Sequence, residues 1–265
     1  MELYIGTSGY SYSDWKNTFY PEDLKQSGML KFYSNQFNFV ELNFSYYREP
    51  SLHQLEKMSR IVPENFKFTI KAHKSITHET YHFIKNRIKL FKENIHILSE
   101  SGKLLGVLLQ FPYSFHYTKA NRIYLAKVCD EFAPFPVFIE FRNRDWHKQT
   151  VYNTMLKKEL SLVTTDLPEI ANLPNWQIIR TTETLYCRFH GRNYESWWKG
   201  TNVSRYDYLY EKNALEQRAD EIIQKIQSGS VLIVAFNNHY KGKAIRNAIT
   251  MKSLLEQKFQ RHLIK

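Results

Sequence analysis

The feature that most constrains the fold is an alternation of short β-type runs with longer helical patterns along the chain. This alternation predicts parallel strands joined by crossover helices. Eight such runs favour a closed barrel over an open sheet, and 265 residues suit one β/α barrel, which needs about 250. We therefore predict an α/β fold, a (β/α)8 TIM-type barrel, with residues 1–265 as a single domain. The expected strands are Leu3–Ser8, Phe37–Phe44, Phe66–Ala72, Leu104–Phe111, Val137–Arg142, Leu160–Asp166, Leu185–His190 and Val231–Asn237, and helices are expected near 51–61, 79–100, 118–132, 149–158, 210–227 and 243–262.

Within these runs, a period of two separates an apolar set that faces the helices from an inward set that turns polar toward the carboxyl end. A charged group inside a barrel costs several kcal/mol unless it is paired or hydrated. Its repeated placement at one end therefore predicts a polar mouth, where barrel enzymes carry their chemistry. In the second run, the expected inward set is Phe37, Phe39, Glu41 and Asn43. The whole predicted ring is Glu41, Asn43, Lys71, Gln110, Glu140, Arg142, Asp166, Arg188, His190 and Asn237.

The charge of the chain favours anionic partners. Lys plus Arg total 37 against 26 Asp plus Glu, a formal net charge of +11, which suits phosphorylated metabolites, acidic sugars or nucleic acid. The excess is spread along the expected helices, so a merely solvated basic surface is the alternative.

Cysteine usage and the amino terminus indicate the compartment. Cys129 and Cys187 lack the spacing of a zinc site or a disulfide framework, and we expect both to be buried, reduced thiols. The first residues do not resemble a signal peptide, and no membrane span is expected, so we predict a cytoplasmic protein.

Two connections are long. Residues 9–30 are rich in aromatic side chains, and residues 191–209 exceed the usual βα loop of about two to six residues, which suggests a lid or binding role. Aromatic loop residues could stack against a sugar ring or a base, or could simply pack the loops onto the barrel. They are Tyr10, Tyr12, Trp15, Tyr46, Tyr47, Trp146, Trp197 and Trp198.

Seven ordered segments carry a family resemblance. They are GTSGYSYSDW (6–15) with FYP (19–21), VELNFSYYREPS (40–51), KAHKSITH (71–78), LLGVLLQFP (104–112), IEFRNRDW (139–146), YCRFHG (186–191) and FNNHYKGKAIRNA (236–248). Together they resemble the YecE-like family of domains of unknown function, number seventy-two in its series. The resemblance implies a β/α barrel and no particular activity. Its distinctive positions fall on Trp15, Glu41, Asn43, Tyr47, Lys71, His78, Gln110, Glu140, Arg142, Trp146, Asp166, Arg188, His190, Asn237 and Asn238.

Four residues are candidate catalytic groups. Glu41 and Glu140 could converge as an acid/base pair with one pKa raised by burial, or each could simply hold a basic side chain. Lys71 could bind an anion, form a salt bridge, or act as a nucleophile, although nothing in the sequence signals a Schiff base. His190 could be a base, a proton shuttle or a structural histidine.

The predicted binding residues centre on two arginines. Arg142 and Arg188 present planar groups suited to carboxylate or phosphate. Gln110 and Asn237 would orient the substrate. Asn43, Asp166, Tyr47, Trp15 and Trp146 complete the predicted set.

We expect neither a metal nor a cofactor. The sequence contains no HExxH-type spacing, and interleaved Arg and Lys would repel a cation. For His78 a structural role is favoured, with Thr77 marking a nearby helix start.

The sequence thus suggests an acid/base enzyme, a hydrolase or lyase, acting on a small anionic substrate such as a phosphorylated or acidic sugar. Two alternatives remain: a nucleic-acid-binding or repair-associated protein, and a non-catalytic ligand-binding barrel.

Overall fold

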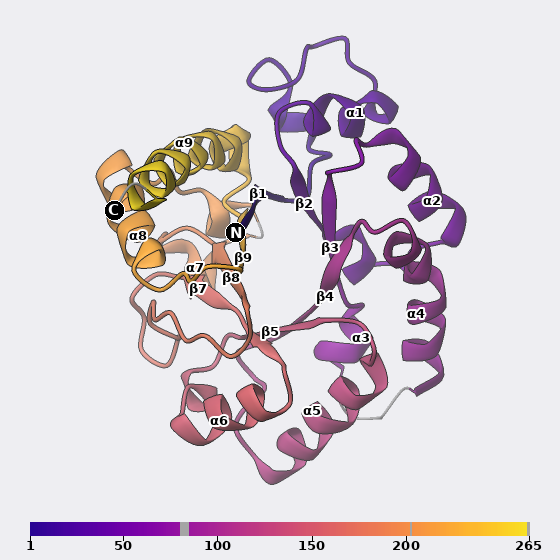
Figure 1. The fold of residues 1–265 in the computed structure, drawn as a ribbon, viewed down its shortest axis with the longest axis vertical. Coiled ribbons are helices and arrows are strands. Elements are labelled where there is room, and N and C mark those ends of the chain that lie inside the picture. The colour runs from indigo at the N-terminus through magenta and orange to yellow at the C-terminus, as the bar shows by residue number, and fades with distance from the viewer. Residues whose placement is uncertain (80–84, 202, 264–265) are drawn as a thin grey trace.

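Nine strands form the centre of the protein and helices surround them, as the computed structural model shows (Figure 1). The structure describes residues 1–79, 85–201 and 203–263, the last three by their backbone alone. The strands are β1 (Glu2–Ser8), β2 (Phe39–Leu42), β3 (Lys67–Lys71), β4 (Leu104–Phe111), β5 (Val137–Phe141), β6 (Ser161–Leu162), β7 (Thr164–Asp166), β8 (Thr184–Phe189) and β9 (Val231–Phe236). The helices are α1 (Met29–Ser34), α2 (Leu52–Ile61), α3 (Lys74–Thr77), α4 (Lys85–Glu100), α5 (Lys119–Phe132), α6 (Gln149–Lys157), α7 (Ser196–Lys199), α8 (Lys212–Ile223) and α9 (Lys243–Leu263).

The sheet closes into a barrel. Its parallel strands follow the order β6-β5-β4-β3-β2-β1-β9-β8-β7, so β6 and β7 are its two ends. Val163 alone separates these two strands in the chain, and its amide N–H donates to the carbonyl of Ile139 in β5 at 2.9 Å. The predicted barrel is therefore confirmed, with the sixth expected run divided because its first part pairs with β5 and its last part with β8.

The long helices follow the predicted pattern closely. α2, α5, α6, α8 and α9 match their expected ranges, and hydroxyl caps explain two of the starts. Ser51 accepts from the amide of Gln54 at the start of α2, and Thr118 accepts from Asn121 at the start of α5. The range expected near 79–100 includes residues 80–84, which lie outside the described residues, and α4 occupies its remainder.

The helix near His78 begins earlier than expected. A helix start marked by Thr77 is wrong, because Thr77 is the last residue of α3 and His78 is its C-cap. The N-cap is His73, whose ring nitrogen accepts from the amide of Ser75 at 3.2 Å. Like α1 and α7, α3 is too short to show a helical period in the sequence.

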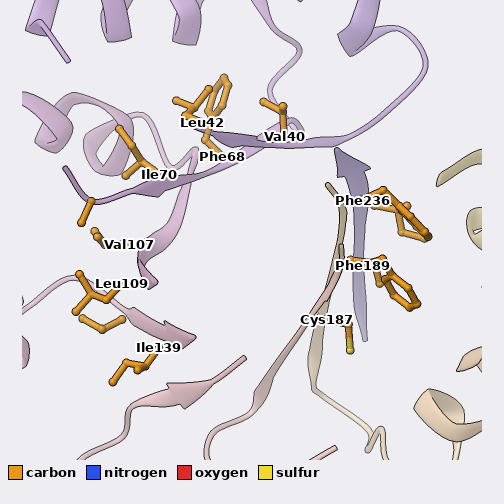
Figure 2. Close-up of a cluster of buried hydrophobic side chains, with 14 of the residues drawn as sticks. Val40, Leu42, Phe68, Ile70, Val107, Leu109, Ile139, Cys187, Phe189 and Phe236 are labelled. Atoms are coloured by element: carbon orange, nitrogen blue, oxygen red, sulfur yellow. The ribbon is translucent and has the colours of Figure 1, made fainter. Parts of the chain in front are cut away.

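Apolar side chains pack on both sides of the strands. Those on the outer side point toward the helices, as Figure 2 shows for Val40, Ile70 and Ile139. Apolar side chains on the inner side fill the interior of the barrel. The expected inward position of Phe37 is wrong, because this residue precedes β2 and packs in the outer core. Its ring centroid lies 4.9 Å from that of Tyr33. The inner set is Tyr4, Phe39, Leu108, Phe138, Val163, Tyr186, Ile233 and Ala235.

Both cysteines are buried and free, as predicted. Among the described residues, no helix has the length and apolar character needed to cross a membrane.

Candidate active site

A cavity of about 920 Å³ opens at the carboxyl ends of the strands. Several residues enter it because they end or directly follow a strand: Lys71 ends β3, Arg142 follows β5 and Asn237 follows β9. Seven of the predicted site residues line it, namely Asn43, Tyr47, Lys71, Gln110, Arg142, Arg188 and Asn237. Other lining residues are Tyr12, Tyr46, Lys74, His78, Pro112, Tyr113, Ser114, Leu173, Trp197, Trp198, Val203, Arg205, Tyr206 and His239.

Arg188 joins two buried carboxylates beneath this cavity. Its Nε and Nη2 donate to the two oxygens of Glu41, each at 2.7 Å, and its Nη1 donates to Glu140. Glu140 also accepts a hydrogen bond from Nε of Arg142. Neither carboxylate lines the cavity, and both side chains are fully buried. Each carboxylate therefore holds a basic side chain, which is the second of the two alternatives considered from the sequence.

The ion pairs keep Glu140 and Arg188 in their charged forms. Burial would raise the pKa of Glu140, but the guanidinium groups of Arg142 and Arg188 outweigh it and hold that pKa well below its usual range. Burial would lower the pKa of Arg188, but Glu140 and Glu41 raise it well above its usual value. Glu140 is therefore ionised at neutral pH.

His190 lies deep in the same network. Burial and the charge of Arg142 hold its pKa well below the usual range, so the ring is neutral. Asn237 Nδ2 lies 3.0 Å from its Nδ1, and Arg142 Nη2 lies 3.2 Å from both ring nitrogens. Its Nε2 is 3.4 Å from Glu140. His190 is thus enclosed by other side chains and does not reach the cavity.

Lys71 has a different environment. Its Nζ donates to Oε1 of Gln110 at 2.7 Å and lies 4.3 Å from the ring centroid of Tyr46. Burial and the nearby charge of Arg188 lower the pKa of Lys71 to about 7. Lys71 is therefore a cavity-lining group whose charge changes near neutral pH.

Besides Glu41, Glu140 and His190, three more predicted site residues lie outside the cavity lining. Asp166 accepts from Arg192 at 2.7 and 2.6 Å, and also from Arg218 and Tyr210. The indole N–H of Trp15 donates to the carbonyl of His239 at 2.7 Å. The indole N–H of Trp146 donates to the carbonyl of Phe115 at 2.6 Å. Both tryptophans are buried, so they pack loops onto the barrel.

The long connection after β8 covers part of the mouth. Within it, Trp197 of α7 packs with Leu167 and Leu173 and is buried. The guanidinium carbons of Arg142 and Arg205 lie 5.6 and 5.7 Å from the Trp197 ring centroid. The sequence indicated this segment as a lid or binding loop, but it gave no signal that singled out Arg205.

The polar ring predicted from the sequence did not include Tyr186. Its hydroxyl donates to Glu41 at 2.5 Å and lies 3.2 Å from the hydroxyl of Thr69. The period of two along β8 places Tyr186 on the same side as Arg188 and His190, so the signal was present.

In the part of the chain that the structure describes, no group of three or more His, Cys, Asp or Glu residues is arranged to hold a metal ion. The carboxylates of Glu41, Glu140 and Asp166 are instead bonded to arginines.

Fold and cavity together define a β/α-barrel protein with a basic, aromatic mouth above an interior arginine–carboxylate network. The sequence pattern of the family described as "Protein of unknown function DUF72" matches residues 4–265, so the chain belongs to the DUF72 family. This confirms the resemblance found in the sequence to domain family seventy-two.

Relatives agree with this assignment over nearly their whole lengths. The chain is 31% identical over 270 residues to the UPF0759 protein YunF of Bacillus subtilis (strain 168), covering 96% of this chain and 95% of that one. A crystal structure of a DUF72 family protein from Thermotoga maritima MSB8 is 36% identical with a TM-score of 0.89, covering 97% of this chain and 100% of that one. One from Enterococcus faecalis V583 is 28% identical with a TM-score of 0.83, covering 96% of this chain and 95% of that one.

Proposed function

We propose that the mouth cavity binds a small anionic molecule and that the protein is an acid/base enzyme, a hydrolase or lyase, acting on it. The observation that carries this proposal is the charge of the cavity wall. Among the described residues that line it, five are basic and none is acidic. The basic residues are Lys71, Lys74, Arg142, Arg188 and Arg205.

The interior network supports anion capture. Arg142 and Arg188 are held from below by Glu140 and Glu41, so their positions are set before a ligand enters. Such preorganisation lowers the cost of binding, because the groups need not be ordered by the ligand. Phosphorylated or acidic sugars fit this proposal, because the aromatic walls suit a ring and the guanidinium groups suit a phosphate or carboxylate.

Lys71 is the proposed proton-transfer group. An acid/base catalyst works best when its pKa lies near the working pH, and the pKa of Lys71 is about 7. Glu140 is paired and ionised, and Glu41 is bonded to Arg188, so both act as positioning residues in this account. Gln110 orients the Lys71 amine and Asn237 holds His190.

The test begins with a thermal-shift panel, followed by titration calorimetry. The panel contains phosphosugars, sugar acids, their neutral parent sugars and short single-stranded DNA, each at low and high salt. We expect an anionic sugar to stabilise the protein while its neutral parent does not. Product analysis with a stabilising anion then shows whether a bond is hydrolysed or eliminated, and Lys71→Gln should abolish that turnover.

Lys67→Gln is the matched control, because Lys67 lies on the same strand and bonds the carbonyl of Gly102 at the opposite end of the barrel. Equal stabilisation by neutral and anionic sugars would contradict the proposal. Stabilisation by DNA alone, abolished by salt, would favour the nucleic-acid-binding alternative, because phosphate contacts release counterions.

A further inference from the structure

Lys71 differs from the arginines of the mouth in what holds its charged end. Arg142 and Arg188 donate to carboxylates, whereas the hydrogen bond of Lys71 goes to the neutral amide oxygen of Gln110. The carboxylates of Glu41 and Glu140 are already bonded to arginine. The charge of the Lys71 ammonium is therefore poorly compensated where it lies.

The surroundings of Lys71 favour a neutral amine. Burial and the guanidinium groups of Arg188 and Arg142 lower the pKa of Lys71 to about 7, and they outweigh the carboxylates of Glu41 and Glu140, which act in the opposite direction. His78 is neutral and adds no further positive charge, because burial and the nearby Lys71 lower its own pKa to about 3. The groups that face Lys71 are Gln110, Tyr46, His78, Arg142, Arg188, Glu41 and Glu140.

We infer that Lys71 is a nucleophile toward a carbonyl carbon, so the ligand of the mouth cavity is an aldehyde or ketone that carries a carboxylate or phosphate. This inference rests on the proposed anion binding, adds the reactive group of the ligand, and gives the Lys71 amine a covalent role in place of proton transfer alone. A lysine with a free electron pair, placed in a cavity with guanidinium groups for the anion, has the features that imine formation requires.

The step is balanced within the cavity. The neutral Nζ of Lys71 attacks the carbonyl carbon, a carbon–nitrogen bond forms, and one amine proton passes to the carbonyl oxygen to give a carbinolamine. The carbon–oxygen bond then breaks, the hydroxyl leaves as water with the second amine proton, and the carbon–nitrogen double bond of the imine forms. No oxidant or reductant is needed.

The test uses glyoxylate, an aldehyde that carries a carboxylate, with borohydride to reduce any imine to a stable carboxymethyl-lysine. Peptide mass spectrometry of the wild-type protein should locate the adduct on Lys71, at least tenfold above Lys67. Acetaldehyde, which has no anion, should label Lys71 at least tenfold less than glyoxylate does. Equal labelling of Lys71 and Lys67 by glyoxylate would overturn the inference.

Gln110→Glu provides a second variant that keeps the size of the side chain. A carboxylate beside Lys71 should raise the pKa of its amine, so the pH of half-maximal labelling should rise from near 7 by about one unit or more. An unchanged pH profile would contradict the role assigned to the neutral partner.

Glycolate separates this inference from the proposed function, because it keeps the carboxylate and replaces the aldehyde with an alcohol. If glycolate protects Lys71 from acetylation but glyoxylate leaves no adduct, anion binding stands and the nucleophile is refuted. If neither protects nor labels Lys71, both proposals fail.

Discussion

Arg188 contacts both buried carboxylates of the barrel interior, so each carboxylate has a measurable part in stability. We predict that Glu41→Gln lowers the free energy of unfolding by about 3–5 kcal/mol, because it leaves a buried guanidinium with less compensation. Urea denaturation measures this loss. Glu56→Gln is the control: its pair with Arg60 is exposed, so the loss should stay below about 1 kcal/mol. Similar losses for both variants would contradict the account.

Lys71 should make stability depend on pH. Its pKa is about 7 in the folded protein and 10.5 ordinarily, so between these values the unfolded chain binds more protons. Stability should therefore rise with pH across this window, by up to about 1.4 kcal/mol per pH unit. We predict that Lys71→Met removes this rise whereas Lys67→Met keeps it, as measured by denaturation at several pH values. A rise that persists in Lys71→Met would show that other groups cause it.

For individual residues, the sequence predicted which side chains lie close together better than it predicted the role of each side chain. The period of two places Glu41, Glu140 and Arg188 on the inner face. It cannot show that Arg188 lies between both carboxylates, because that depends on strand stagger across the barrel. Asp166 satisfied the same pattern, yet it bonds Arg192 and Arg218 outside the cavity.

Helix α1 is tied to the first two strands by one hydroxyl group. The Tyr33 hydroxyl accepts from the amide of Thr7 at 2.8 Å and donates to the carbonyl of Phe39 at 3.0 Å. We predict that Tyr33→Phe destabilises the protein by about 1–3 kcal/mol, because two buried backbone groups lose their partner. Tyr194→Phe is the control, since Tyr194 is 65% exposed and should change thermal unfolding little. Equal midpoints for the two variants would contradict this role.

The connection after β8 should affect anion binding more than it affects the stability of the barrel. Trp197 packs with Leu167 and Leu173 in a small cluster apart from the main core, and it lies beside Arg142. We predict that Trp197→Ala weakens anion binding at least tenfold while the unfolding midpoint shifts only a few degrees. Tyr194→Ala is the matched control, because Tyr194 lies in the same connection, is 65% exposed and does not line the cavity. Calorimetry that finds equal affinities for the two variants would show that Trp197 does not shape the site.

At the scale of elements, local patterns predicted the long helices and all eight strand runs. The short helices α1, α3 and α7 could not be predicted, because four to six residues do not show a period of 3.6. The division of the sixth run at Val163 depends on which neighbour each half pairs with, and a single run does not contain that information.

For the whole molecule, the formal charge of +11 raises the question of whether anions bind at the mouth or over the general surface. Several surface cations are already paired, such as Lys158 with Asp130 at 2.9 Å and Lys258 with Asp220 at 2.5 Å. Binding at one enclosed site should depend less steeply on salt than binding spread over many exposed cations. Binding spread over many exposed cations weakens strongly when salt is raised from about 50 to about 200 mM. We predict that the same change weakens the affinity of the mouth cavity for a small anion less than tenfold.

The most direct measurement is acetylation of individual lysines at pH 8, followed by mass spectrometry, with and without the tightest-binding anion of the panel. Lys71 should react readily in the free protein, because its pKa is about 7 and it lines the cavity. We expect the anion to slow acetylation of Lys71 at least tenfold and to leave acetylation of Lys67 unchanged. Binding of the anion with no protection of Lys71 would place the anion elsewhere and contradict the account.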